Sequence, residues 1–176
     1  MADSVFILTT PNPLGLSDVE SRANSTFVDI DGDSDLDGFV NNVFFENKGI
    51  ASNPIFAAGV TNPFGLRLGD KPAFVDIDGD GDLDAFGSDY TNSTLLLFKN
   101  TGTAINPIFA SEVANPYGLN GLGSNTSLVF VDIDGDGDFD GFAGEYHGST
   151  LFFRNTGTAS SAVFAAPVSA LQYGAA

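Results

Sequence analysis

Residues 74–86 read FVDIDGDGDLDAF, and this stretch decides the fold because the chain contains it three times. The other copies are FVDIDGDSDLDGF at residues 27–39 and FVDIDGDGDFDGF at residues 130–142. Each copy places five aspartates at alternate positions, and apolar residues that read as strands flank them. The copies begin 47 and 56 residues apart, which is the range of a four-stranded propeller blade. The sequence therefore predicts three β-blades, each with an acidic loop.

Three more landmarks recur with the same spacing. An Asn-x-Gly turn begins at Asn47, Asn100 and Asn155. The motif Asn-Pro-Ile-Phe stands at 53–56 and 106–109, and a degenerate copy of it stands at 162–165. Asn-Pro-x-Gly-Leu stands at 12–16, 62–66 and 115–119. Because one copy precedes the first acidic loop, we predict an extra N-terminal blade strand. The expected single domain, 1–176, thus holds that strand at 5–16 and repeats at 25–66, 72–119 and 128–172. In the middle repeat we expect strands at 73–75, 85–87, 95–98 and 108–113.

The composition favours an all-β protein. Of 176 residues, 43% are hydrophobic and 17 are Phe, so the chain can build a core, while 21 Gly and 8 Pro indicate short strands joined by turns. The absence of Cys excludes disulfides and thiolate metal sites. No apolar run reaches the length of a membrane-spanning helix, so we expect no membrane insertion.

The acidic charge is concentrated. Fifteen of the 23 acidic residues lie in three windows, 29–37, 76–84 and 132–140, which leaves 8 acidic and 6 basic residues elsewhere, a net of −2. Five carboxylates in nine residues repel one another unless a cation neutralises them. Three divalent cations would raise the net charge from −17 to −11. The chain has no basic patch, so we expect no nucleic-acid partner.

Calcium is the cation that this pattern favours, because it takes six to eight oxygen ligands and a Gly-containing loop can wrap it. We expect side-chain ligands from loop positions 1, 3, 5 and 9 and a main-chain carbonyl from position 7. The EF-hand is excluded because position 12, its closing Glu, is Val40, Gly87 or Ala143 here. Magnesium prefers fewer carboxylates, and zinc would need Cys or more than one His. The three predicted calcium sites comprise Asp29, Asp31, Asp33, Asp35 and Asp37; Asp76, Asp78, Asp80, Asp82 and Asp84; and Asp132, Asp134, Asp136, Asp138 and Asp140.

At these loops the sequence resembles the FG-GAP/VCBS repeat family, whose blades build integrin-α-like β-propellers. The family's D-x-D-x-D-G-x-x-D loop matches at 29–37, 76–84 and 132–140, except that Ser34 replaces the glycine found at Gly81 and Gly137. The resemblance implies four-stranded blades with calcium bound between the first two strands. It also implies that the calcium is structural and that loops on the propeller face carry the function.

The number of predicted blades indicates whether the chain associates with a second copy of itself. Closed propellers typically have four to eight blades, whereas this chain supplies three and a spare strand. It could form half of a six-bladed ring closed by a second copy, a piece of a longer propeller, or an open array. An open array would expose Phe-rich blade faces, so we expect a symmetric homodimer.

No catalytic constellation is visible, because the chain lacks Cys and has one His, so we expect no enzyme. Repeats two and three carry longer hairpins with Asp89, Tyr90, Glu145, Tyr146 and His147, where an acid beside an aromatic ring could bind a sugar or peptide. Solvated turn residues are the alternative. Residues 120–127 form a further loop insertion. We expect a calcium-stabilised scaffold or interaction module of a secreted or cell-surface protein, as in adhesion; the alternative is a calcium-dependent carbohydrate-binding module. Its first residues do not resemble a secretory signal, so a removed leader or another export route is implied.

Overall fold

The computed structural model describes residues 14–17, 19, 23–89, 91–120, 122, 126–145 and 148–169. Within them, twelve strands form three four-stranded antiparallel sheets, which confirms the all-β prediction. We call the sheets blades 1 to 3. Blade 1 holds β1 (Ser25–Val28), β2 (Asp37–Val40), β3 (Val43–Phe45) and β4 (Val60–Thr61); blade 2 holds β5 (Ala73–Val75), β6 (Asp84–Asp89), β7 (Thr94–Phe98) and β8 (Val113–Ala114); blade 3 holds β9 (Ser127–Val131), β10 (Asp140–Gly144), β11 (Thr150–Phe153) and β12 (Val168–Ser169).

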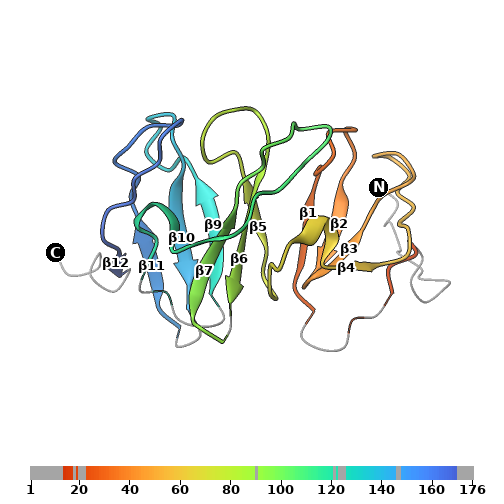
Figure 1. Cartoon of the computed structure of the whole chain (residues 1–176), viewed down its shortest axis with the longest axis horizontal. Coiled ribbons are helices and arrows are strands. Elements are labelled where there is room, and N and C mark those ends of the chain that lie inside the picture. Colours follow the sequence, from red (N-terminus) through yellow and green to blue (C-terminus); the bar gives the residue numbers. More distant parts are fainter. Residues whose placement is uncertain are drawn as a thin grey trace, which may run out of the picture.

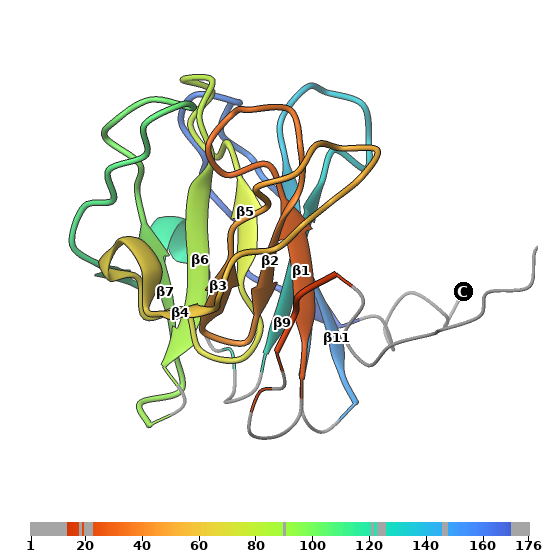
Figure 2. The same ribbon diagram turned by 90° about the vertical axis from the view of Figure 1, so that its right-hand side faces the viewer.

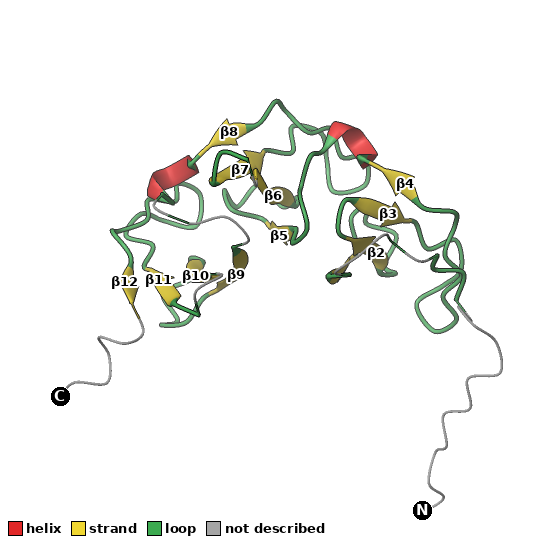
Figure 3. Ribbon diagram, turned by 90° about the horizontal axis from the view of Figure 1, so that it is seen from below, coloured by secondary structure: helices red, strands yellow, loops and turns green. Residues whose placement is uncertain are grey.

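The blades stand side by side in an arc, each built from one continuous stretch of chain (Figure 1). Seen from below, β5 lies toward the concave side of the arc and β8 on the convex side (Figure 3). Within each blade the strands follow in chain order and pair as neighbours, as in β5-β6-β7-β8. The arrangement is that of blade-like repeats, and among the described residues one face of blade 1 and one face of blade 3 have no neighbouring blade.

Apolar clusters join neighbouring blades, and the alternation of side chains along β7 shows how. Leu96 and Phe98 belong to the cluster between blades 1 and 2, whereas Leu95 and Leu97 belong to the cluster between blades 2 and 3. Successive residues of a strand point to opposite faces, so blade 2 is packed on both sides. Its second strand accordingly begins with four buried residues, 84–87.

Each blade-to-blade connection runs through the Asn-Pro-x-Gly-Leu motif. The motif forms a single 3-10 turn, η1 (Pro63–Gly65) or η2 (Pro116–Gly118), and its final leucine, Leu66 or Leu119, is buried between two blades. No helix in the described residues is long and apolar enough to cross a membrane.

Residues 14–16, the described part of the motif copy before blade 1, make the equivalent contact. The backbone N–H of Phe56 donates to the carbonyl of Leu14 at 3.0 Å, as that of Phe164 donates to Tyr117 at 2.9 Å. The extra strand predicted at 5–16 falls on residues 5–13, which lie outside the described residues, and on residues 14–16, which form no strand. Its existence therefore stays a prediction.

The strand boundaries agree with expectation except for the fourth. The segment 73–75 matches β5, and the predicted 85–87 and 95–98 extend to β6 and β7. The fourth strand, predicted at 108–113, was wrong, because β8 spans only Val113–Ala114. Residues 101–112 instead form a loop held by the side chain of Asn100, and Ile108 is 64% exposed. Apolar residues at this point do not indicate a buried strand.

Candidate metal centres

The aspartate loops join the first two strands of every blade and lie at the same edge of the arc, the upper edge in Figure 1. In blade 2, one carboxylate oxygen from each of Asp76, Asp78 and Asp80 lies within 4.8 Å of the others. The triads Asp29, Asp31, Asp33 and Asp132, Asp134, Asp136 converge in the same way. Each triad could hold a metal ion, and each consists of loop positions 1, 3 and 5.

The first aspartate shapes the loop by accepting hydrogen bonds from the backbone ahead of it. The carboxylate of Asp76 accepts from the N–H groups of Gly79 at 2.7 Å, Asp80 at 3.1 Å and Gly81 at 3.0 Å. Gly79 and Gly81 take φ values of 70° and 91°, which a glycine adopts without strain. These contacts curl the chain so that alternate carboxylates point inward.

Loop position 6 is a glycine in blades 2 and 3 but not in blade 1. Ser34 occupies this position in blade 1 with φ 74° and donates its backbone N–H to Asp29 at 3.0 Å. A non-glycine residue at positive φ is strained. The loop geometry is therefore kept in blade 1 at a cost in backbone energy.

The aspartate at position 9 ties the loop to the rest of its blade. Asp84 is 1% exposed, and its carboxylate accepts a hydrogen bond of 2.7 Å from the backbone N–H of Asn100. Burial raises the pKa of Asp84 to about 7 and that of Asp37 to about 6, although hydrogen bonds from backbone N–H groups oppose the rise. Asp37 and Asp140 accept from Asn47 and Asn155, also at 2.7 Å.

The recurring asparagine completes this tie. The side-chain Oδ1 of Asn100 accepts from the backbone N–H of Gly102 at 3.0 Å and of Ile108 at 2.9 Å, and Asn47 and Asn155 make the equivalent pairs of bonds. The sequence identifies these asparagines only as turn residues. Their recurrence directly after the third strand was the available signal for this role.

Seven buried carboxylate oxygens have no hydrogen-bond partner among the described residues, and all seven belong to the three loops. They are Asp29 Oδ1, Asp31 Oδ1, Asp35 Oδ1, Asp37 Oδ2, Asp78 Oδ1, Asp82 Oδ1 and Asp138 Oδ1. Burying an anionic oxygen without a partner costs several kcal/mol or forces protonation. A hard cation is the partner that satisfies several such oxygens together, so the residues present fit a divalent metal.

Position 7 also carries a buried side chain. We expect a main-chain carbonyl ligand there, which stays a prediction, and Asp35, Asp82 and Asp138 are 6–7% exposed, each with Oδ1 buried without a partner among the described residues. Burial is the main cause that raises the pKa of these three carboxyls. The side chain at position 7 could therefore supply a further oxygen ligand beside those of positions 1, 3 and 5.

Basic side chains reach two of the loops, which the sequence analysis missed. Lys99 forms an ion pair with Asp78 and lies 3.9 Å from Asp80, and Arg154 pairs with Asp134. In blade 1 the equivalent residue is acidic, Glu46. The signal available in the sequence was the residue preceding each recurring asparagine.

The hairpin candidates lie at the opposite end of the strands, after β6 and β10. Asp89 accepts hydrogen bonds from the backbone N–H groups of Thr91 at 2.9 Å and Asn92 at 3.3 Å and from Asn92 Nδ2 at 2.7 Å, and these bonds lower its pKa. Its carboxylate therefore shapes the turn. The backbone of Glu145 also closes a turn, by accepting from Gly148 at 3.0 Å. The remaining candidates, Tyr90, Tyr146 and His147, lie outside the described residues.

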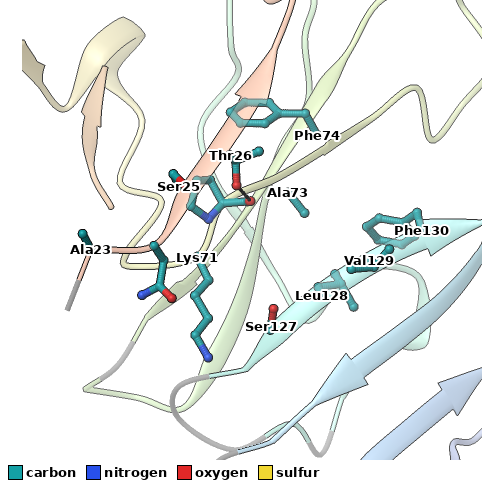
Figure 4. A pocket seen from close by; sticks show the side chains of 12 residues that line it. Ala23, Ser25, Thr26, Lys71, Ala73, Phe74, Ser127, Leu128, Val129 and Phe130 are labelled. Atoms are coloured by element: carbon teal, nitrogen blue, oxygen red, sulfur yellow. Dashed lines mark hydrogen bonds between the residues drawn. The ribbon is translucent and has the colours of Figure 1, made fainter. Parts of the chain in front are cut away.

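A pocket of about 500 Å³, which the sequence did not reveal, lies among the first strands of the three blades (Figure 4). Its lining comes from residues 23–26, 71–74 and 127–130. These segments precede the aspartate loops, so the pocket lies toward the same end as the hairpins; Figure 2 looks along the row of blades, so that β1, β5 and β9 overlap in it. Lys71, Ser25 and Ser127 line it together with Phe74 and Phe130.

Residues 76–143 match the family model described as the FG-GAP-like repeat. The matched segment begins at the first aspartate of the blade 2 loop and ends in β10, so it contains two complete aspartate loops. No curated protein and no solved structure gives a significant match to the chain. The resemblance drawn from the aspartate loops is thereby confirmed for residues 76–143, the part of the chain that the family model matches.

Proposed function

We propose that the protein is a calcium-stabilised β-propeller scaffold and interaction module of a secreted or cell-surface protein. The observation that carries the proposal is the set of seven buried, unpartnered carboxylate oxygens in the three loops. Calcium suits them because it accepts six to eight oxygen ligands, including many carboxylates, whereas magnesium usually retains several waters. FG-GAP repeats are typical of extracellular proteins, which supports the proposed location.

In this proposal calcium has a structural role. The carboxylates at positions 1, 3, 5 and 7 would hold the ion, and position 9 already links the loop to the asparagine after the third strand. An ion at this point would bind the first, second and third strands of a blade together. FG-GAP repeats are generally non-enzymatic interaction modules, which fits a scaffold.

Thermal unfolding with calcium and with chelator tests the proposal. A ligand at one hundred times its Kd stabilises the folded state by about 2.7 kcal/mol per site, which corresponds to a Tm rise of roughly 5–10 °C for a chain of this size. Asp80→Asn should reduce the rise, because Asp80 belongs to a triad, whereas Asp70→Asn at an exposed position outside the loops should not. An unchanged Tm for the wild-type protein would overturn the calcium assignment.

We also propose that a second copy of the chain covers the free face of blade 3 and completes a six-bladed ring. Val129 and Ile133 are 58% and 57% exposed, whereas the equivalent residues of blade 2, Ala73 and Ile77, are 9% and 2% exposed against blade 3. The apolar face that is buried between blades 2 and 3 is thus repeated on blade 3, where the described residues leave it exposed.

The complementary face belongs to blade 1. Phe27 and Leu36 are 46% and 54% exposed, whereas their blade 2 equivalents, Phe74 and Leu83, pack into the cluster between blades 1 and 2. One chain therefore presents both halves of a blade interface. Two copies related by a two-fold axis along the ring axis would form this interface twice and close the ring.

The molecular mass in solution tests the ring. We expect a dimer at micromolar concentration, and Val129→Glu should give a monomer because it places a charge in the interface. Val113→Glu is the matched control, since Val113 is 53% exposed on the outer strand β8 and should remain dimeric. A monomeric wild-type protein would contradict the proposal.

Carbohydrate binding is the second candidate function, and the pocket of Figure 4 favours it. Asn24, Ser25, Lys71 and Ser127 supply polar groups to its lining, which suits the hydroxyl groups of a sugar. Because the aspartate loops lie at the other end of the strands, calcium would act here by holding the blades in place. A glycan array should show ligands that Ser127→Trp abolishes, and a blank array would remove this candidate.

A further inference from the structure

We infer that the residue immediately before each recurring asparagine sets how strongly its loop binds metal, so that blade 1 holds calcium more tightly than blades 2 and 3. This residue is Glu46 in blade 1, Lys99 in blade 2 and Arg154 in blade 3. The inference rests on the proposed calcium binding and concerns the differences among the three sites.

The three residues occupy one backbone position of the repeat. The carbonyl of Glu46 accepts a hydrogen bond of 2.8 Å from the N–H of Ala57, and the carbonyls of Lys99 and Arg154 accept equivalent bonds of 2.8 Å from Ala110 and Ala165. The backbones therefore match, and the side chains differ in charge. Because the residue after the asparagine also differs, Lys48 in blade 1 and Thr101 or Thr156 in the others, substitutions at the single position isolate the effect of its charge.

In blades 2 and 3 the basic side chain already neutralises part of the triad. Lys99 pairs with Asp78, the position 3 aspartate, and lies 3.9 Å from Asp80 of the same triad. Arg154 pairs with Asp134, the position 3 aspartate of blade 3. A divalent ion that enters either triad meets a fixed positive charge beside it and must displace or tolerate that charge.

Blade 1 has the opposite electrostatics. The basic side chain that pairs with the position 3 aspartate in the other blades is replaced by Glu46, which pairs with Lys48 at the surface. Four of the seven unpartnered carboxylate oxygens belong to this blade, on Asp29, Asp31, Asp35 and Asp37. Blade 1 thus has more uncompensated negative charge, so its folded state depends more on the metal.

The size of the effect follows from Coulomb attraction. One unit charge a few ångströms from a divalent ion changes its affinity roughly tenfold even in a water-like dielectric. Salt screening reduces the effect for side chains that are partly exposed, as Lys99 is at 41%. Replacing Lys99 by Glu should therefore tighten binding at the blade 2 loop by about tenfold or more at low ionic strength.

Terbium luminescence can report on the blade 2 loop. Tyr117 lies in η2, which contacts β7 of blade 2, and packs against the cluster between blades 2 and 3. The chain has no Trp, so Tyr is the sensitiser of bound terbium at ultraviolet excitation. The part of the signal that both Tyr117→Phe and Asp80→Asn remove belongs to the blade 2 loop, and a titration of that part gives the affinity of this site.

We would compare Lys99→Glu and Lys99→Gln with Arg67→Glu. The control makes the same charge change at a residue paired with Glu112, outside the loops. Lys99→Glu should tighten terbium binding about tenfold, Lys99→Gln should tighten it about threefold, and Arg67→Glu should change it less than twofold. Lys99→Gln, which adds no negative charge, also serves as the test if Lys99→Glu does not fold.

Calcium calorimetry gives the reciprocal test on blade 1. The wild-type protein should show one tight site and two weaker sites, and Glu46→Lys should lose the tight class. If wild-type protein binds no terbium or calcium, the proposed function fails. If it binds but Lys99 variants behave like Arg67→Glu, or Glu46→Lys keeps the tight site, this inference alone is overturned.

Discussion

The buried asparagine after the third strand gives the sharpest prediction about stability. Asn100 is 1% exposed, and Asn100→Ala removes an acceptor that holds two backbone N–H groups, those of Gly102 and Ile108. A hydrogen bond contributes about 1 kcal/mol net, and a buried donor left without a partner costs more. Ile108 is 64% exposed, so water can replace its bond, whereas Gly102 is half-buried. We expect a loss of about 2–3 kcal/mol in the free energy of unfolding.

Urea unfolding measures this loss, and the same loop offers a control. Asn106 is exposed and forms backbone hydrogen bonds with Thr103, so Asn106→Ala should cost less than about 0.5 kcal/mol. Asn100→Ala should lower the free energy of unfolding by the same amount when calcium is present. The hydrogen bonds to Asn100 Oδ1 do not involve the aspartate carboxylate oxygens that would bind the metal. Equal stability of the two variants would refute the view that this asparagine fastens the loop.

Three further predictions follow from the loops and the blade contacts. In metal-free buffer the folded protein has pKa values of about 7 for Asp84 and about 6 for Asp37, above the unfolded value of 3.8. The free energy of unfolding should therefore be highest near pH 4 and decrease through pH 6–7. Urea unfolding curves that show rising stability across this range would contradict the burial of these carboxyls. Ser34→Gly should raise the free energy of unfolding by about 0.5 kcal/mol, because φ 74° suits glycine, and a measurable decrease would show that the serine is unstrained. Gly87→Ala should lower Tm, because the added Cβ would lie 2.5 Å from Leu68 Cα and such overpacking costs about 1–3 kcal/mol. An unchanged Tm would show that the segment around Leu68 moves aside without cost.

Much of the fold could be predicted because the chain contains three copies of one repeat, which can be compared with one another. The apolar residues on both sides of each aspartate loop predicted the first two strands, and β5 has the predicted bounds. The fourth strand was wrong because Ile108 and Phe109 look like a strand, although the side chain of Asn100 fixes the backbone there. The pattern of hydrophobic residues indicates which residues are buried. It does not indicate where a side chain distant in sequence forms a hydrogen bond with the backbone.

The candidate metal site was partly predictable for a related reason. Alternate aspartates predicted convergence, and positions 1, 3 and 5 do converge. The inward side chain of Asp82 and the ion pair of Lys99 with Asp78 depend on how the loop lies against the third strand. The pocket was invisible because it draws residues from three blades that are distant in sequence.

The continuity of each sheet along the chain bears on how the protein is made. Every blade consists of strands that are consecutive in sequence, so its contacts are local and it can fold as soon as its own residues have left the ribosome. Blade 1 would form first and offer its apolar face as a template for blade 2. Because the apolar clusters of the described residues join neighbouring blades, a gene duplication that adds one repeat would lengthen the arc without rebuilding the rest.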